Sequence, residues 1–341
     1  MELTHRSVTL RLPEPFTISR GTDETADVVW VELRANGVIG HGEGAPIERY
    51  GESAESALAF LEESGDLLGD DPFALEEIGG RLAAHPGEMA AKSALDAALH
   101  DLCGKLVGLP VWRLLGLPQL GPPTSWTIWL GDPDDMARRA ERAHPLFRRL
   151  KLKLGGRDGL DIERVRSVRS VTALPLMVDV NEYWEPEEAL ENVAALADLD
   201  VEYVEQPLPA GHPAGARLRR EARLPIYLDE DCHTLGDIRE CAERGHGVNI
   251  KLAKSGGIRE AVKMAASARS LGLGVMLGCM LESGLGIAAG AQVASLCDYV
   301  DLDGNLLLAE DPWQGVDFRD GVQTPSDAPG LGVHEAVPDP R

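Results

Sequence analysis

Five charged residues recur at nearly constant spacing through the second half of the chain: Lys153, Asp179, Glu205, Asp229 and Lys251. The gaps between them are 26, 26, 24 and 22 residues, and each residue comes at the end of a short apolar run. One strand, one loop and one helix together occupy about that many residues. The spacing therefore predicts one polar group at each strand end, and in a closed parallel barrel those ends converge on one face.

Strand and helix patterns alternate strictly from residue 124 onward. Apolar runs of strand length are separated by segments with helical periodicity, such as 161–171, 186–196 and 258–271. This alternation predicts an α/β fold with a parallel TIM barrel. The eight predicted strands are 124–130, 148–154, 174–180, 201–207, 225–231, 247–253, 274–280 and 299–303.

The first part of the chain follows a different pattern. Alternating apolar residues surround an Asn36-Gly37 pair, which is a strong hairpin signal, and helical segments follow at 53–63, 74–84 and 90–106. Strands first and helices afterwards indicate a separate α+β domain. We therefore predict three parts: an α+β domain (1–118), a barrel domain (119–314) and a C-terminal segment that returns to the first domain (315–341).

The composition limits the kinds of partner. A net charge of −23 repels nucleic acid and anionic membranes, so neither is expected to bind. No run of 18 apolar residues exists, and the N-terminus lacks the apolar stretch of a signal peptide. Five cysteines without C-x-x-C spacing favour a reducing compartment, so we expect a cytoplasmic protein.

Three carboxylates and two lysines at one barrel mouth indicate a metal site with a proton-transfer group on each side. Asp179, Glu205 and Asp229 are hard oxygen ligands, which suit Mg²⁺, and without a cation they would repel one another. Lys153 and Lys251 lie on the second and sixth strands, roughly opposite each other. One lysine can then remove an α-proton from a carbon acid while the other returns a proton to the opposite face.

The difficulty of that proton transfer explains the metal. An α-proton beside a carboxylate is very weakly acidic, so the enediolate must be stabilised as it forms, which a divalent cation can do. Lys151 precedes Lys153 by two residues, so the two share one strand face, about 6–7 Å apart. Lys254, in contrast, is expected to be an ordinary surface lysine.

The chain resembles the enolase superfamily, in its muconate-lactonizing subgroup, and within it the dipeptide epimerases typified by L-Ala-D/L-Glu epimerase. The resemblance covers nearly the whole chain, through FTISRG, GEGAPIERYGES, KLKLG, VDVNEYW, VEQPLP, LDEDCHT, NIKLAKSGG, GCMLES and DLDG. It implies a capping domain over a modified (β/α)7β barrel. The implied activity is that of an isomerase, which inverts the α-carbon of the C-terminal residue of a dipeptide. Relatives are often oligomers, so a homo-oligomer is expected.

The resemblance also implies a role for each residue of the site. One Mg²⁺ per subunit, with Mn²⁺ as a substitute, would be bound by Asp179, Glu205 and Asp229, and Lys153 and Lys251 would be the acid/base pair. The residues with supporting roles would be Lys151 as an electrostatic helper at the substrate and Asn181, Glu230 and Glu282 as polar neighbours.

Asp301-Leu302-Asp303 narrows the activity within the superfamily. Two aspartates at i and i+2 share one face at the end of the last strand and can hold a cation between them. In the dipeptide epimerases this D-x-D pairs with the free α-ammonium group of the substrate, whereas the plain alternative is an acidic turn before Gly304. We include Thr127, on the first barrel strand, as a further substrate-binding residue.

Specificity is expected from a loop of the capping domain, residues 18–27, with residues 48–53 alongside. Arg20 can pair bidentately with a side-chain carboxylate, which would fit a glutamate substrate. Some glutamate-selective relatives carry a second arginine where this chain has Asp23, so a neutral or cationic residue stays open. Asp231 stands where serine is usual, and the sequence offers no account of it.

Several activities fit the same scaffold. The leading prediction is epimerisation of L-Ala-D/L-Glu, as in cell-wall peptide metabolism, and a dipeptide epimerase that prefers a non-acidic second residue is an alternative. An o-succinylbenzoate synthase, an N-succinylamino acid racemase or a muconate cycloisomerase would use the same lysines and metal without needing Asp301 and Asp303. A metal-binding barrel without catalysis is the remaining class.

Overall fold

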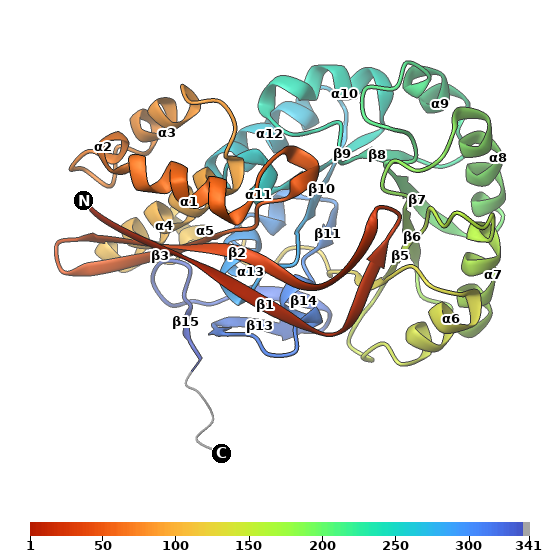
Figure 1. Cartoon of the computed structure of the whole chain (residues 1–341), viewed down its shortest axis with the longest axis horizontal. Coiled ribbons are helices and arrows are strands. Elements are labelled where there is room, and N and C mark those ends of the chain that lie inside the picture. The colour runs from red at the N-terminus through yellow and green to blue at the C-terminus, as the bar shows by residue number, and fades with distance from the viewer. Residues whose placement is uncertain (337–341) are drawn as a thin grey trace.

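The computed structural model describes residues 1–336, so the end of the predicted C-terminal segment, 337–341, lies outside the described residues. A parallel barrel with helices around it forms the right-hand part of Figure 1, and an antiparallel sheet with its own helices forms the left-hand part. A long hairpin of the antiparallel sheet reaches across toward the barrel strands (Figure 1). The arrangement matches the predicted fold class.

Eight parallel strands follow one another around the barrel in chain order. Closure comes from a bridge between Thr124 and Val300, where Ser125 N donates to Val300 O at 3.0 Å. All eight predicted strands are present, each shorter than its apolar run. They are β4 (Trp126–Ile128), β5 (Leu150–Lys153), β6 (Leu176–Asp179), β7 (Val201–Glu205), β8 (Ile226–Leu228), β9 (Gly247–Lys251), β10 (Gly274–Gly278) and β11 (Tyr299–Asp301).

Helices join successive strands, as the predicted (β/α)7β order requires. Helix α8 shows why these segments are helical: Pro186 begins it, Glu185 and Glu188 form a capping box, and its apolar residues face the barrel. The helices are α6 (Pro133–Glu141), α7 (Asp161–Val171), α8 (Pro186–Ala197), α9 (Gly215–Glu221), α10 (Ile238–Arg244), α11 (Leu252–Ser255), α12 (Ile258–Ser270) and α13 (Gly284–Ala291).

The barrel interior has an apolar floor. Met177, Tyr203, Tyr227 and Met276 are buried together, and the Tyr203 and Tyr227 ring centroids lie 4.7 Å apart. Side chains alternate along a strand, so the inward-facing position two residues after Met177, Tyr203 or Tyr227 is one of the three predicted carboxylate ligands. The polar layer of the barrel mouth therefore rests on a layer that excludes water.

The N-terminal domain begins with an antiparallel meander of β1 (Glu2–Ile18), β2 (Gly21–Ala35) and β3 (Val38–Gly44). Asn36 and Gly37 form the turn between β2 and β3 with φ angles of 52° and 76°, as the sequence predicts. Its helices are η1 (Glu48–Tyr50), α1 (Ala54–Glu63), α2 (Gly65–Leu68), α3 (Leu75–Ala83), α4 (Met89–Val107) and α5 (Val111–Leu114).

Helix α4 packs closely on the meander because β3 presents glycines to it. A Cβ atom at Gly40, Gly42 or Gly44 would lie 2.0–2.2 Å from a main-chain oxygen of α4. Only glycine leaves room for this approach. The alternation of glycines in IGHGEG (39–44) thus lets α4 pack directly on β3.

The predicted specificity loop, residues 18–27, is largely a strand. Strand β1 continues to Ile18 and β2 begins at Gly21, so only Ser19 and Arg20 form the turn. The prediction of a loop was wrong because residues 21–25 are exposed and carry no apolar alternation that would indicate a strand. Their partner in register is β1, which supplies the hydrogen bonds.

The C-terminal segment contacts the N-terminal domain. Leu331 N donates to Asp101 Oδ1 at 2.7 Å, Gly330 bridges Pro110, and Arg6 pairs with Glu335 at 3.0 Å. The segment contains β13 (Val316–Arg319), β14 (Val322–Pro325) and β15 (His334–Glu335), and β15 pairs with β12 (Trp313–Gln314), which directly precedes the segment. The three predicted domain boundaries stay a prediction, to which these contacts lend support.

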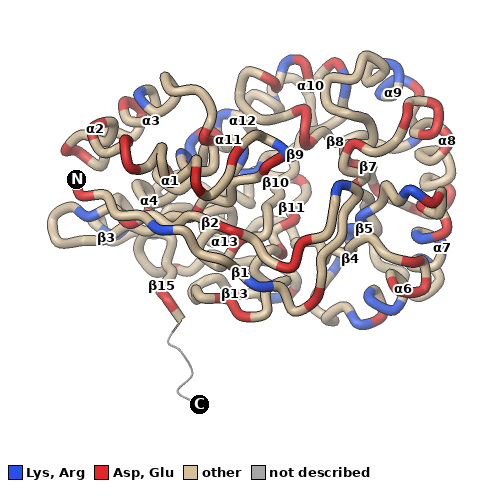
Figure 2. The backbone as a smooth tube through the Cα atoms, viewed as in Figure 1, with Lys and Arg blue, Asp and Glu red and all other residues tan. Residues whose placement is uncertain are grey.

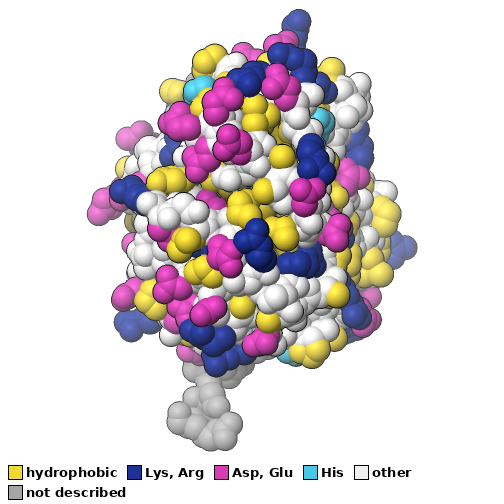
Figure 3. All heavy atoms as spheres, turned by 90° about the vertical axis from the view of Figure 1, so that its right-hand side faces the viewer, with side chains coloured by type: hydrophobic (Ala, Val, Ile, Leu, Met, Phe, Trp, Pro, Cys, Tyr) yellow, Lys and Arg dark blue, Asp and Glu magenta, His cyan; other side chains and the backbone are white. Residues whose placement is uncertain are grey.

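Acidic and basic residues are mixed along the outer helices of the barrel (Figure 2). Figure 3 shows the same mixture on the surface of the barrel side, with small apolar areas between the charges. On that face acidic side chains are therefore interspersed with basic ones. Within residues 1–336, no helix is both long and apolar enough to cross a membrane.

Candidate active site

Three buried carboxylates lie next to one another at the C-terminal ends of the barrel strands. Asp179 and Glu205 are the last residues of β6 and β7 and are paired in register, and Asp229 directly follows β8. Each is at most 1% exposed. Because the strands follow chain order, the regular spacing in the sequence becomes adjacency in space.

The two lysines of β5 lie among these carboxylates. Lys151 Nζ is 2.8 Å from Glu205 Oε2, 2.8 Å from Asp301 Oδ2 and 3.2 Å from Asp179 Oδ2. Lys153 is paired in register with Asp179, and its Nζ lies 2.7 Å from Asp179 Oδ2. Strand alternation thus aims both ammonium groups into the barrel mouth.

Two more lysines hold the third carboxylate. Lys251 Nζ, at the end of β9, lies 2.8 Å from Asp229 Oδ2. Lys254 Nζ donates to the main-chain oxygen of Asp229 at 2.5 Å and also to its carboxylate. The prediction of a surface lysine was wrong: Lys254 is 2% exposed, because α11 starts directly after β9 and i, i+3 spacing turns both lysines to the same side.

Burial and the surrounding charges together shift the pKa values of the three carboxylates in different directions. Burial alone would raise the pKa of Asp179, but Lys153 and Lys151 outweigh it and lower the pKa. Asp229 behaves similarly, because Lys251 and Lys254 overcome the effect of burial and hold its pKa well below the usual value. Glu205 differs: burial and repulsion from Asp179 raise its pKa to about 7.

The three carboxylates supply a donor set that suits a hard divalent cation. Among residues 1–336, no three His, Cys, Asp or Glu side chains converge with the spacing of a metal site. Each carboxylate instead has a lysine ammonium group within 2.8 Å. Glu205 Oε2 is buried without a hydrogen bond, since Lys151 approaches it outside hydrogen-bonding geometry. The chemistry of these donors fits Mg²⁺, and Glu205 Oε2, which accepts no hydrogen bond, could bind it in place of its ion pair with Lys151.

The last barrel strand brings both aspartates of D-x-D into the mouth. Asp301 accepts hydrogen bonds from Lys151 Nζ at 2.8 Å and from Ser125 Oγ. Asp303 accepts one from Thr127 N at 2.7 Å. Burial and the neighbouring Asp301 raise the pKa of Asp303 to about 7, so an approaching cation would favour its ionised form. Thr127 thus orients Asp303, and Ser125 is a residue that the sequence prediction missed.

The tip of the β1–β2 hairpin touches the barrel mouth. Arg20 NH1 donates to Glu230 Oε1 at 2.7 Å, and Ser19 Oγ donates to Asn181 O at 3.1 Å. Asn181 Nδ2 contacts the same Glu230 oxygen at 3.3 Å, and its Oδ1 lies 3.4 Å from Lys153 Nζ. Two of the three predicted supporting residues, Asn181 and Glu230, therefore form one chain from the hairpin to Lys153.

A substrate carboxylate would have to compete with Glu230 for Arg20. Asp23, on β2, is partly buried and has a second acid, Glu48, near it, and both effects raise its pKa. Arg20 favours an acidic side chain on the substrate and Asp23 disfavours one, so the two residues act in opposite directions.

Asp231 has a structural explanation. Its carboxylate accepts hydrogen bonds from Gln206 Nε2 at 2.8 Å and from Gly211 N at 2.9 Å, and it pairs with Arg244 at 3.0 Å. It therefore ties the loop after β7 to the loop after β8. This explains why an acid is stable at that position.

Glu282 lies beside a second buried acid that the sequence prediction missed. Glu43, from β3, accepts hydrogen bonds from Trp30 Nε1 at 2.6 Å and from Ser283 N at 2.8 Å. Burial raises the pKa of Glu43 to about 7, and burial together with Glu43 raises that of Glu282 to about 8. Its position at the end of β3, in GEG, gives no sign that a barrel loop covers it.

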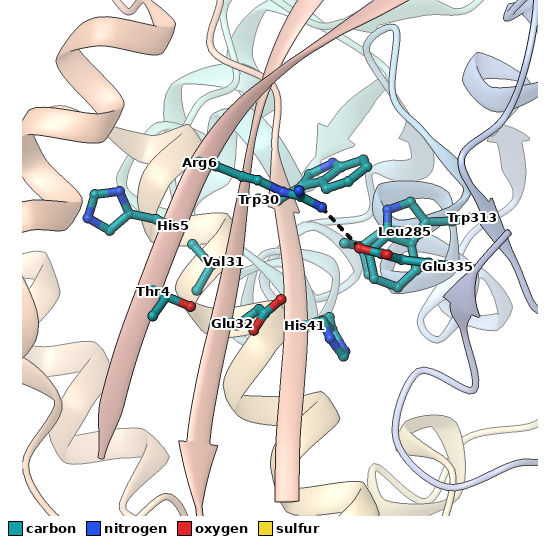
Figure 4. A pocket seen from close by; sticks show the side chains of 10 residues that line it. All are labelled: Thr4, His5, Arg6, Trp30, Val31, Glu32, His41, Leu285, Trp313 and Glu335. Atoms are coloured by element: carbon teal, nitrogen blue, oxygen red, sulfur yellow. Dashed lines mark hydrogen bonds and ion pairs between the residues drawn. The ribbon is translucent and has the colours of Figure 1, made fainter. Parts of the chain in front are cut away.

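A cavity of about 380 Å³ lies outside this mouth, on the sheet of the N-terminal domain. Figure 4 shows Arg6, Trp30 and His41 of the sheet facing Trp313 of β12 and Glu335 of the C-terminal segment. Arg6 is satisfied by its ion pair with Glu335 and by stacking 4.9 Å from the Trp30 ring. None of the predicted site residues lines this cavity.

The fold and the site together define a barrel enzyme with a covering domain and a carbon-acid site. The Enolase C-terminal domain-like family matches residues 135–336, and the Mandelate racemase / muconate lactonizing enzyme, N-terminal domain family matches residues 1–116. The chain belongs to the mandelate racemase and muconate lactonizing enzyme family of the enolase superfamily. The resemblance inferred from the sequence is confirmed.

Individual relatives refine the comparison. The L-Ala-D/L-Glu epimerase of Bacteroides thetaiotaomicron is 38% identical over 98% of this chain and 88% of that protein. A dipeptide epimerase from Enterococcus faecalis, solved with Mg and L-Leu-L-Tyr, is 33% identical with a TM-score of 0.93, covering 97% of this chain and 98% of that one. A muconate lactonizing enzyme from Pseudomonas fluorescens is 31% identical, with a TM-score of 0.93 and coverage of 98% and 96%. The fold alone therefore does not separate these activities.

Proposed function

We propose that the chain is a Mg²⁺-dependent dipeptide epimerase, an isomerase that inverts the α-carbon of the C-terminal residue of a dipeptide. The observation that carries the proposal is the position of Lys153 and Lys251, four strands apart in an eight-stranded barrel, with buried carboxylates between them. A substrate carbon held between them has one amine on each face.

The two lysines perform the proton transfer. One lysine, as the neutral amine, takes the α-proton, and the other, as the ammonium ion, gives a proton to the opposite face of the carbon. The roles exchange when the opposite stereoisomer is the substrate. Burial lowers the pKa of Lys251, but Asp229 overcomes this effect and raises it, which suits Lys251 to hold the proton that is donated.

The carboxylates and Lys151 stabilise charge. One Mg²⁺, bound by Asp179, Glu205 and Asp229, would supply positive charge at the substrate carboxylate, and we propose that Mn²⁺ can replace it. Lys151 adds a permanent cation, because ion pairs with Glu205 and Asp301 hold its pKa well above the usual value, although burial opposes them. The apolar floor of the barrel keeps water away from these groups.

The aspartates of the last strand favour a dipeptide over the other substrates of the family. Asp303 has a main-chain donor at 2.7 Å, and a substrate ammonium group would stabilise its ionised form. Asp301 lies beside it and is oriented by Ser125 and Lys151. A muconate or succinylbenzoate substrate carries no ammonium group and would leave this pair of acids uncompensated.

The residues at the hairpin tip suggest two candidates for the second residue of the dipeptide. L-Ala-D/L-Glu is the first candidate, because Arg20 is the cation at that tip and the Bacteroides relative is named for this substrate. A dipeptide with an apolar second residue is the other candidate, because Glu230 already holds Arg20 and Asp23 adds negative charge nearby.

A substrate screen with Mg²⁺ tests the proposal. The wild type should epimerise one or more dipeptides, and Asp301→Asn with Asp303→Asn should abolish this activity. The same double variant should be compared on an N-succinylamino acid, which lacks the ammonium group. Turnover of the N-succinylamino acid by the wild type, with little effect of the double variant, would point to the rival racemase activity instead.

Two further expectations stay predictions. Cytoplasmic localisation rests on the five dispersed cysteines, which are all free thiols in the structure. Homo-oligomerisation rests on the resemblance to the family, and gel filtration with light scattering would measure it directly.

A further inference from the structure

Glu182 connects the barrel to two separate parts of the N-terminal domain. It follows Asn181 in the loop after β6, a position for which the sequence suggests no role. Its carboxylate accepts two hydrogen bonds from Arg49, Nε to Oε2 and NH2 to Oε1, both at 2.7 Å, and Arg20 NH1 lies 3.4 Å from Oε2. Ala210 N donates to the same carboxylate at 2.9 Å.

The two arginines come from different segments that cover the mouth. Arg20 is at the tip of the β1–β2 hairpin, which reaches toward the ends of β5 to β7 in Figure 1. Arg49 is in η1, whose Tyr50 also stacks edge-on against His233 of the barrel at 4.2 Å between centroids. One carboxylate of the barrel thus joins both covering segments.

The backbone at this point is held in an unusual conformation. Asn181 and Glu182 have φ angles of 47° and 73°, in the left-handed region that non-glycine residues avoid. Fixed contacts maintain it: Asn181 N donates to Asp179 Oδ1 at 3.0 Å, and Glu182 N donates to Gln206 O at 2.8 Å. The loop therefore presents Glu182 to the N-terminal domain from a rigid base that includes a proposed metal ligand.

We propose that Glu182 is a positioning residue that holds the β1–β2 hairpin tip and η1 closed over the barrel mouth, and that this closure sets the binding of the dipeptide's C-terminal residue. The inference rests on the proposed function. The Glu182 carboxylate bonds to the two arginines and to Ala210 rather than to the lysines of the mouth, so its effect falls on substrate binding and not on proton transfer.

Glu182→Gln tests the inference without changing the size of the side chain. We expect KM for the best dipeptide to rise about tenfold while kcat changes less than about threefold, because the bidentate pair with Arg49 is lost. Amide hydrogen exchange should accelerate in residues 16–23 and 47–53. Glu182→Asp should recover part of the loss.

Matched variants separate the closure held by Glu182 from a general effect of charge. Arg49→Gln should give the same change as Glu182→Gln, and the two together should be no worse than either alone. Glu187→Gln removes an exposed bidentate pair with Arg217 on the outer helices and should leave KM and exchange unchanged.

Kinetics and hydrogen exchange together test the proposed closure by Glu182. Unchanged KM and unchanged exchange in Glu182→Gln would overturn it, as would faster exchange without a rise in KM, or full additivity of the two variants. If the wild type epimerises no dipeptide, the proposed function fails, whereas the exchange measurement still tests the closure by itself.

Discussion

Lys254→Met removes a buried cation and retains a long apolar side chain. The Lys254 side chain is 0% exposed, and its Nζ donates to both the main-chain oxygen and the carboxylate of Asp229. Removing one partner of a buried ion pair costs about 3–5 kcal/mol when the remaining charge is left uncompensated. Lys251 still lies 2.8 Å from Asp229, so we expect the lower end of that range, about 3 kcal/mol.

Urea unfolding of the metal-free protein measures this loss. The control is Lys263→Met, since Lys263 is 35% exposed and pairs with Glu260 at 3.0 Å on the surface of α12. Exposed pairs of this kind contribute under about 1 kcal/mol, so the control should unfold nearly like the wild type. If both variants fall within about 1 kcal/mol of each other, on the scale that separates exposed from buried pairs, the argument from burial is refuted.

Two further predictions concern the metal and the pH dependence. EDTA should abolish epimerisation, and Mg²⁺ should restore it and raise the unfolding midpoint, because it binds only the folded chain; no change in either measurement would contradict the metal site. Glu43 and Glu282 have pKa values of about 7 and about 8, above the ordinary 4.5, so the stability that they contribute is present below pH 4.5 and is lost as the pH rises through 7 and 8. The free energy of unfolding should therefore fall between about pH 4.5 and pH 8 and level off above pH 8, and Glu43→Gln should flatten that fall.

The sequence predicts the barrel and its charged mouth because both depend on local patterns. Each predicted ligand or lysine ends an apolar run, and a chain-ordered barrel turns equal spacing into adjacency. The spacing alone is thus enough to place Asp179, Glu205 and Lys153 side by side. The same reasoning gives the pair Asp301 and Asp303, since alternation alone puts both on one face.

What the sequence did not predict depends on contacts between distant segments. Lys254 looks like a surface residue until α11 is seen to begin immediately after β9. Residues 21–25 form a strand through pairing with β1, without any apolar face of their own. Glu182 meets Arg49, and Glu43 meets Ser283, only when the N-terminal domain lies against the barrel, so no local pattern could indicate these contacts.

Solvent exchange at the substrate α-carbon tests the central claim most directly. The wild type, with Mg²⁺ and a dipeptide in D₂O, should incorporate deuterium at the α-carbon of the C-terminal residue of both stereoisomers. Lys153→Ala and Lys251→Ala should each abolish epimerisation, and each should still exchange only the stereoisomer that faces its remaining lysine. A folded, metal-loaded enzyme that exchanges no dipeptide, or a lysine variant that still epimerises, would contradict the two-lysine mechanism.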